Sequence, residues 1–252
     1  MEENKSSESK SCQSHLFISF VLPAYNEEKS VLHLMDQITS AMAVINEIYE
    51  VVFVVEGEDK TNEILTQYQS EHPLVKLKIL YQKKPLGLTN AFKKGFENVS
   101  SGCTHVVTMD VDLNHKPSEL PRLIEKAREG YNIVIGSRAM EGSKVMDVPT
   151  WKRMISKFAN AVFNKAFNIN VKDKTSGYRM VDIQTVKEVS PLIKSENFEG
   201  LMEFLLIANK LKKKITEVPI TLTYREYGQT KFRLFQAGLG YAKLLMGRNL
   251  KR

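Results

Sequence analysis

Two aspartates one residue apart, Asp110 and Asp112, close an apolar run that begins at Val106. Carboxylates so near each other repel, and a divalent cation that prefers oxygen ligands relieves the repulsion. Asn114 and His115 add an amide oxygen and an imidazole close by. An Asp-x-Asp sequence can also be a solvated acidic turn, but the apolar run before it favours a site for a metal and a phosphate.

The two aspartates need a strand that carries them to the edge of a sheet. The run from Val106 is rich in β-branched residues, which is typical of a buried strand, and Pro117 follows the polar turn. Because alternate side chains of a strand point the same way, we expect both carboxylates on one side, around Val111. Ligands of open α/β sheets bind at the carboxyl edge, so this position favours a binding site.

Short apolar runs alternate with helical patterns through the first half of the chain. The predicted strands are 16–22, which Pro23 stops, 49–55, 75–81, the run from Val106, and 133–135. The predicted helices are 31–42, with Asn26 as its N-cap, one through 64–68, 88–96 and 117–129. This alternation indicates a mostly parallel sheet with crossover helices. Farther on we expect helices at 149–167 and 199–211, and a strand at 215–223 whose Pro219 indicates an edge or a bulge.

Composition limits the class of protein. A chain of 252 residues, 42% hydrophobic and 26% charged, suits one α/β domain, which we place at 15–230. Residues 1–14 should be a disordered tail, and 231–252 a basic amphipathic segment. Cys12 and Cys103 lack disulfide or zinc spacing, which suits a reducing compartment. No apolar run approaches the ~20 residues that span a bilayer. The net charge of +7 favours an anionic partner.

Polar residues also gather at three other predicted strand ends. They are Tyr25-Asn-Glu27, Glu56-Gly-Glu-Asp59 and Ser137-Arg138. Because the ends of parallel strands converge, we expect these stretches to line one crevice with the aspartates. Acidic groups there can accept hydrogen bonds from ribose hydroxyls, and arginine can pair with phosphate oxygens at two points.

The order of these motifs resembles that of a known enzyme family. Pro23-Ala-Tyr-Asn-Glu27, Met109-Asp-Val-Asp-Leu-Asn-His115, Gly136-Ser-Arg138, Asp173-Lys-Thr-Ser-Gly-Tyr-Arg179 and Tyr224-Arg-Glu-Tyr-Gly-Gln-Thr-Lys231 follow one another. This order resembles the family 2 glycosyltransferases, particularly the branch of dolichol-phosphate mannose synthases, over about residues 16–232. The resemblance implies a GT-A type, Rossmann-like sheet flanked by helices in a single domain.

The resemblance also implies roles for individual residues. The nucleotide pocket would include Pro23, Tyr25, Glu27, Val55 and Glu56, with Asp110 and Val111 near the ribose and sugar. Asp112 and Asn114, with Asp110 beside them, would hold Mg²⁺ or Mn²⁺ on the diphosphate. The phosphates of donor or acceptor would contact Arg138, Arg179, Arg225 and Lys231. Asp112, Arg138 and Arg225 would be the catalytic residues.

One stretch departs from the family pattern. The family commonly has an Asp-Asp-x-Ser stretch after the second strand, where this chain has Val55-Glu-Gly-Glu-Asp-Lys-Thr61. Glu56 can still accept hydrogen bonds from a base or ribose. Its side chain is longer than that of the family's aspartate, which changes the geometry and leaves the identity of the nucleotide open. The Gln-x-x-Arg-Trp signature of processive members is absent from the sequence, which favours a single transfer.

The chemistry suits a phosphate acceptor. Transfer onto a hydroxyl needs a general base, whereas a lipid monophosphate, with a second pKa near 6, is already largely anionic at neutral pH. The reaction then needs a metal for the leaving diphosphate and cations for a second anion. This chemistry favours an inverting transfer onto a dolichyl or polyprenyl phosphate. The resemblance implies that the transferred group is a hexose, with mannose from GDP-mannose favoured.

Other functions remain open at this point. The donor might be a UDP-sugar or the acceptor a glycan, the sheet could serve nucleotidyl transfer, or the chain could be a weakened nucleotide-binding scaffold of a membrane complex. Charge alone suggests nucleic acid, but no reading motif supports it. We expect a cytoplasmic protein that associates peripherally with the cytosolic face of a membrane, where an anchoring subunit could assist it.

Overall fold

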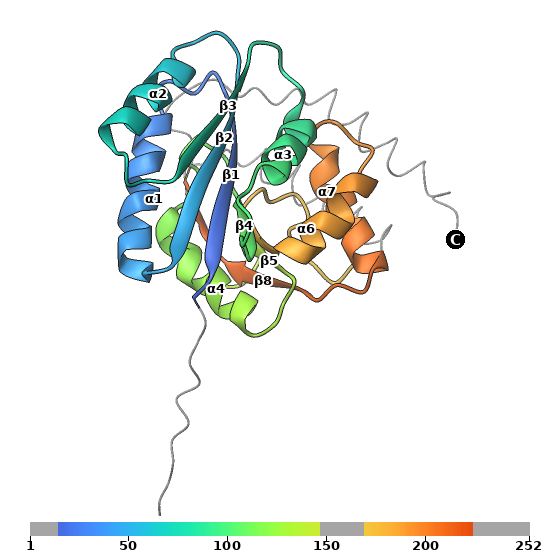
Figure 1. Cartoon of the computed structure of the whole chain (residues 1–252). Helices are drawn as coiled ribbons and strands as arrows, with labels where there is room; N and C mark the ends of the chain where they lie inside the picture. Colours follow the sequence, from blue (N-terminus) through green and yellow to red (C-terminus); the bar gives the residue numbers. More distant parts are fainter. Residues whose placement is uncertain (1–14, 147–168, 224–252) are drawn as a thin grey trace, which may run out of the picture.

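The computed structural model describes residues 15–146 and 169–223, in which a mostly parallel sheet has helices on both faces (Figure 1). The seven strands of the main sheet are ordered β3-β2-β1-β4-β7-β5-β8. They are β1 (Phe17–Tyr25), β2 (Ile48–Glu56), β3 (Leu77–Gln82), β4 (His105–Thr108), β5 (Ile133–Ser137), β7 (Arg179–Asp182) and β8 (Ile215–Pro219). A small second sheet pairs β6 (Lys144–Val145) with β9 (Thr221–Leu222).

The helices divide between the two faces of the sheet (Figure 1). One face carries α1 (Val31–Ile45), α2 (Thr61–Glu71) and α4 (Leu120–Arg128). The other carries α3 (Leu88–Glu97), α6 (Ile183–Val189) and α7 (Glu199–Lys210). Two short 3₁₀ turns, η1 (Pro117–Glu119) and η2 (Ser190–Leu192), complete the described elements. This layered α/β arrangement confirms the predicted fold class.

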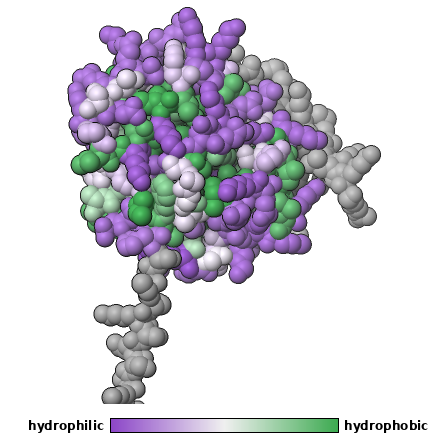
Figure 2. Space-filling view, in the orientation of Figure 1, coloured by the Kyte–Doolittle hydropathy of each residue, from purple (hydrophilic) through white to green (hydrophobic). Residues whose placement is uncertain are grey.

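Burial on both faces explains the continuous apolar runs of the sequence. In β2 every residue from Glu50 to Glu56 is buried, as expected for a parallel strand covered by helices on both sides. The helices cover the sheet with apolar residues at helical spacing, such as Leu34, Ile38 and Met42 of α1. The outer surface on the side shown in Figure 2 is mainly hydrophilic, with hydrophobic residues interspersed.

Two details at the first strand differ from the prediction. Pro23 does not stop β1, because the strand continues to Tyr25 beside β2 after its pairing with β4 has ended at Val21. Asn26 is not a helix cap: its backbone is left-handed, with φ of 51°, and α1 begins after Ser30. The residues between strand and helix therefore form a turn at the carboxyl edge, in which Ser30 N donates to Glu27 O at 3.1 Å.

The largest difference concerns β7. No strand was predicted at residues 179–182, but this segment lies inside the sheet, antiparallel to both β4 and β5. The strand expected at 215–223 divides at Pro219 into β8, which is the edge of the main sheet, and β9. The predicted edge position of Pro219 is thereby confirmed.

Three predicted segments lie outside the described residues. They are the tail at 1–14, the helix at 149–167, and the basic segment at 231–252.

Candidate active site

The loops after β1 and β2 are joined to each other at the carboxyl edge of the sheet. Tyr25 and Glu56 are neighbours in the strand register, and Asn26 N donates to Glu56 O at 3.1 Å. Asn26 Oδ1 accepts from the backbone N–H groups of Glu58 and Asp59, at 3.0 and 3.3 Å. The structure thus brings together the two stretches that were predicted to share a crevice.

Glycine is required where these loops meet. Gly57 has φ of 104°, and a Cβ there would collide with Asn26 Oδ1. Glu27 also belongs to this junction, because its N–H donates to Thr61 Oγ1 at 2.8 Å and its carboxylate accepts from Ser30 Oγ at 2.9 Å. These contacts fix the rim on which Tyr25, 39% exposed, presents its ring.

Glu56 lies at the end of β2 and is almost fully buried. Its Oε1 accepts from Leu86 N at 2.8 Å and from Gln82 Nε2 at 3.1 Å, which ties down the loop before α3. Burial raises the pKa of this carboxyl above its usual value, although these hydrogen bonds and the charge of Lys94 oppose the rise. Glu56 therefore supports the loop as well as standing beside the predicted nucleotide pocket.

The aspartate loop does not continue the strand. β4 ends at Thr108, before both aspartates, so strand alternation does not orient the two carboxylates as the prediction assumed. Asp112 is buried, whereas the Asp110 side chain is 41% exposed. Leu113 between Asp112 and Asn114 has φ of 64°, a left-handed conformation that is strained for a leucine and turns the chain back.

This turn places Asn114 against Asp112. Asp112 accepts from Asn114 N at 3.2 Å and from Asn114 Nδ2 at 2.9 Å. Asn114 Oδ1 is buried and has no hydrogen-bond partner in the described part of the chain. An unsatisfied buried oxygen next to a buried carboxylate suits a hard divalent cation, so these two residues fit the predicted metal.

The protein offers this metal few ligands of its own. Within residues 15–146 and 169–223, no group of three or more His, Cys, Asp or Glu side chains is placed to hold an ion. His115 Nδ1 lies 3.4 Å from Asp110 N, and its ring lies 5.3 Å from that of Tyr178. A site with one or two carboxylates is typical of Mg²⁺, which completes its coordination with water and substrate phosphates.

Residues 173–179 support the aspartate loop from behind. Gly177 O accepts from Thr108 Oγ1 at 2.8 Å, and a Cβ at Gly177 would lie 3.3 Å from Asp110 Oδ1. Ser176 Oγ donates to Gly136 O at 2.6 Å, which joins the same segment to β5. The insertion of β7 between β4 and β5 thus brings this motif against the aspartates.

Arg138 follows β5 and pairs with a carboxylate at two points. Its Nε and Nη2 each lie 2.7 Å from an oxygen of Asp173, and Nη2 also donates to Thr175 Oγ1 at 2.8 Å. Asp173 is buried; burial would raise the pKa of this carboxyl, but the Arg138 charge and its hydrogen bonds bring it below the usual value. Arg138 keeps part of its side chain exposed at the site edge.

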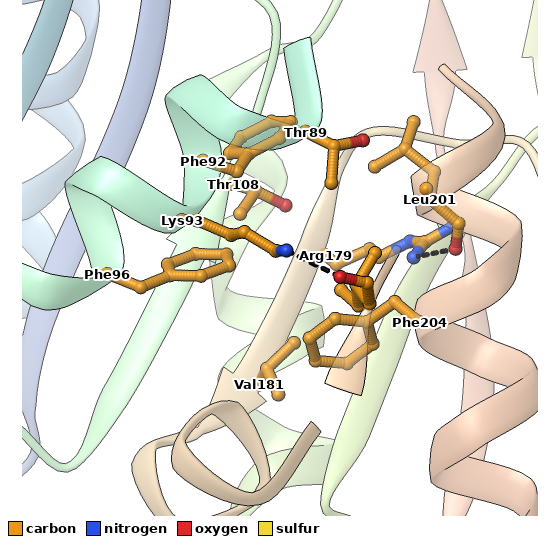
Figure 3. Close-up of a pocket in the computed structure, with 11 residues that line it drawn as sticks. Thr89, Phe92, Lys93, Phe96, Thr108, Arg179, Val181, Leu201 and Phe204 are labelled. Carbon is orange, nitrogen blue, oxygen red and sulfur yellow. Dashed lines mark hydrogen bonds between the residues drawn. The ribbon is translucent and has the colours of Figure 1, made fainter. Parts of the chain in front are cut away.

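Arg179 has a different place from the one predicted. It is 3% exposed, and its guanidinium donates to the carbonyl oxygens of Ser176, Leu201 and Lys174 at 2.8, 2.7 and 2.9 Å. Figure 3 shows it directed toward Leu201 O, at the side of a small cavity lined by phenylalanines. This cavity measures about 30 Å³, too small for a substrate. The prediction that Arg179 contacts a phosphate is therefore corrected: its guanidinium is buried and bound to backbone carbonyl oxygens of the fold.

The remaining predicted residues fall into two groups. Val55 and Val111 are buried in the apolar core, so a ligand would meet their backbone, and Pro23 lies in β1 opposite Val54. Arg225 and Lys231 lie outside the described residues. Sequence reasoning assigned no role to Asp173 or Gly177, although both belong to the quoted 173–179 motif.

Comparison with known proteins bears on this site. The model of the family described as "Glycosyl transferase family 2" matches residues 19–189. A dolichol-phosphate mannosyltransferase of Pyrococcus furiosus is 34% identical over 86% of the chain, which spans 59% of that protein. An undecaprenyl-phosphate mannosyltransferase of Micrococcus luteus is 31% identical over 84% of the chain and 85% of its own length.

A solved structure shares the fold at lower identity. Glucosyl-3-phosphoglycerate synthase of Mycobacterium tuberculosis, crystallised with Mn²⁺, UDP-glucose and phosphoglyceric acid, superimposes with a TM-score of 0.61 at 17% identity. The match covers 91% of this chain and 77% of that one.

Proposed function

The chain is a family 2 glycosyltransferase, and from this membership we propose that it transfers a hexose from a nucleotide sugar onto a polyprenyl phosphate. The two relatives described above are named as mannosyltransferases of dolichol phosphate and undecaprenyl phosphate, which supports mannose as the sugar. GDP-mannose is the donor that we propose for it. The observation that carries the proposal is the pairing, at one sheet edge, of a carboxylate–amide site for a cation with a guanidinium for an anion.

The donor would occupy the rim made by the loops after β1 and β2. Pro23, Tyr25, Glu27 and the end of β2 would form the nucleotide pocket, and Asp110 would lie near the ribose and sugar. Asp112 and Asn114 Oδ1 would hold Mg²⁺ or Mn²⁺ against the diphosphate; the Mn²⁺ in the mycobacterial neighbour agrees with this choice. A bound cation would stabilise the negative charge of the departing diphosphate.

The acceptor needs a second anion site. We place its phosphate at Arg138, with Arg225 and Lys231 as further contacts supplied from beyond residue 223. A phosphate oxygen then forms the new bond to the anomeric carbon as the bond to the diphosphate breaks, with inversion at that carbon. Because the attacking oxygen already carries charge at neutral pH, no side chain has to remove a proton.

Radiolabelled transfer tests the proposal directly. GDP-mannose and UDP-glucose would each be supplied with dolichyl phosphate and Mn²⁺, and butanol-extractable label would be counted with and without EDTA. We expect label from GDP-mannose that EDTA abolishes. Label only from UDP-glucose would change the donor, and calorimetric binding of a donor without transfer to lipid would favour a glycan acceptor or a scaffold.

Asp112→Ala identifies the metal site within the same assay. Loss of its carboxylate should lower turnover on the order of a hundredfold or more, because the leaving charge loses its stabilisation. Glu129→Ala is the control, since Glu129 makes a surface pair with Lys126. Near-normal turnover of Asp112→Ala with Mn²⁺ present would contradict the assignment.

A further inference from the structure

Arg138 is oriented by a carboxylate that solvent hardly reaches. The Arg138 side chain is 27% exposed and the Asp173 side chain 1%. Both oxygens of Asp173 are engaged, since Oδ2 accepts from Arg138 Nε and from Arg138 N at 3.0 Å, while Oδ1 accepts from Nη2. A planar guanidinium held at two points cannot rotate about its long axis.

The carboxylate is in turn fixed to the sheet. Asp173 N donates to Glu217 Oε1 at 2.8 Å, and Lys172 N donates to Glu217 Oε2 at 2.7 Å. Glu217 belongs to β8 and pairs in register with Ile135 of β5, the strand that leads to Arg138. The chain 35 residues downstream of Arg138 is therefore anchored to the same pair of strands.

We propose that Asp173 is a positioning residue, which sets the plane of the Arg138 guanidinium so that it receives the phosphate of the acceptor. The inference rests on the proposed function. Thr175 Oγ1 assists by accepting from the same Nη2. A guanidinium that is already rigid loses less conformational freedom when an anion binds to it. Because the anion that we place at Arg138 is the acceptor phosphate, Asp173 should affect binding of the acceptor rather than binding of the donor.

Asp173→Asn separates this role from general support of the fold. The amide keeps the shape of the carboxylate, but its NH₂ group meets the Nη2 donor, so the two-point pair is lost. We expect KM for dolichyl phosphate to rise, up to about a hundredfold, while KM for GDP-mannose and the thermal midpoint change much less. The control is Glu50→Gln, which removes another buried, hydrogen-bonded carboxylate. Glu50 lies near the amino end of β2, away from the carboxyl edge that carries the site. The control variant should lower stability without changing either KM.

A double-mutant cycle tests whether Asp173 acts through Arg138. Arg138→Lys keeps the charge and loses the two-point geometry, so it should raise acceptor KM by itself. Adding Asp173→Asn should then change KM little further. Effects that multiply would overturn the inference, and so would an Asp173→Asn enzyme with the wild-type acceptor KM.

A second measurement does not depend on activity. The ¹⁵Nε–Hε resonance of Arg138 is assigned by its absence in Arg138→Lys. Its Hε proton should exchange slowly with water in the wild type and much faster in Asp173→Asn. An unchanged exchange rate would overturn the positioning role itself. If the wild type transfers sugar to no polyprenyl phosphate, the proposed function fails and the acceptor role of Asp173 fails with it, whatever the resonance shows.

Discussion

Glu56 holds the loop before α3 at some cost to stability. Its pKa is raised by burial, so the ionised form is less favourable in the folded chain than in the unfolded chain. A carboxyl of this kind lowers stability as pH rises from its unfolded pKa, about 4.3, through its folded pKa. The loss is complete once the pH is well above the folded pKa.

Glu56→Gln should therefore raise stability at neutral pH and weaken nucleotide binding. We expect a higher urea midpoint than wild type at pH 7, a smaller difference at pH 4, and weaker calorimetric binding of GDP with Mn²⁺. Glu58→Gln is the control in the same loop, because Glu58 is exposed and pairs with Lys83 at the surface. A lower midpoint for Glu56→Gln at pH 7 would show that its hydrogen bonds to Leu86 and Gln82 outweigh the buried charge.

Residue types and spacing predicted part of the site. The Asp-x-Asp-x-Asn run predicted a metal site at Asp112 and Asn114, and the structure adds an amide oxygen of Asn114 that is buried and lacks a hydrogen-bond partner among the described residues. Spacing could not show that β4 ends at Thr108, before both aspartates, so the prediction wrongly relied on strand alternation to orient the carboxylates. Spacing also could not show that Asp173 pairs with Arg138. The two residues come together because β7, which follows Asp173, lies beside β5, which precedes Arg138.

At the scale of elements, β7 accounts for most of what the sequence did not reveal. The alternation of apolar runs and helices predicted the parallel strands well, because those strands are buried on both faces. β7 has four residues with charged ones at both ends, a pattern that does not differ from a loop. Its antiparallel insertion places the 173–179 motif against the aspartates and turns Arg179 inward.

Arg179→Lys tests the inward role of Arg179. A lysine ammonium cannot reach the three carbonyl oxygens that the guanidinium joins, and buried acceptors would lose their partners. We expect a loss of about 3 kcal/mol in the free energy of unfolding, measured in urea. Arg122→Lys, at a half-exposed arginine that donates to Pro219 O, should stay within about 0.5 kcal/mol of wild type. Wild-type stability with weakened acceptor binding would restore the phosphate role of Arg179.

The amino end of β2 carries the opposite kind of carboxyl. Burial would raise the pKa of Glu50, but hydrogen bonds from Ser100 and Ser19 and the charge of Lys78 outweigh it and bring the pKa below its usual value. Glu50 joins β1, β2 and β3 with the loop before β4. Such a carboxyl stabilises the fold above its unfolded pKa, and this stability is lost as pH falls through the lower folded pKa.

Glu50→Gln should remove this pH dependence. The wild type should be more stable than the variant at pH 7, and the difference should shrink as pH falls below about 4.3. Urea unfolding of both proteins at pH 7, 5 and 3.5 measures it. A difference that stays constant over this range would mean that the Glu50 carboxylate contributes no stability through its charge.

At the scale of the molecule, the charge and the proposed lipid substrate point to a membrane surface. The part of the chain that the structure describes contains no helix long and apolar enough to cross a bilayer. Its most exposed hydrophobic residues are Leu74 and Val44, beyond α2 and near the end of α1, away from the carboxyl edge. On the side seen in Figure 2 hydrophobic residues are interspersed among hydrophilic ones.

The basic segment at 231–252 is our candidate for the membrane contact. It contains six lysines and arginines and no acidic residue, interspersed with leucine and phenylalanine. Basic residues near an anionic membrane contribute roughly 1 kcal/mol each, and salt screens the effect. Binding that depends on this segment should weaken when its charges are removed, even though the rest of the chain is unchanged.

Flotation of the full chain with vesicles of phosphatidylserine and phosphatidylcholine tests this prediction. Changing Lys243, Arg248, Lys251 and Arg252 to Gln should abolish most flotation, while the wild type floats at low salt and less at high salt. The matched control changes four lysines elsewhere to Gln, namely Lys210, Lys212, Lys213 and Lys214, and should float like wild type. Equal loss in both variants would mean that net charge alone drives binding. Unchanged flotation of the first variant would place the membrane contact outside 231–252, on a surface that must then carry the acceptor lipid to Arg138.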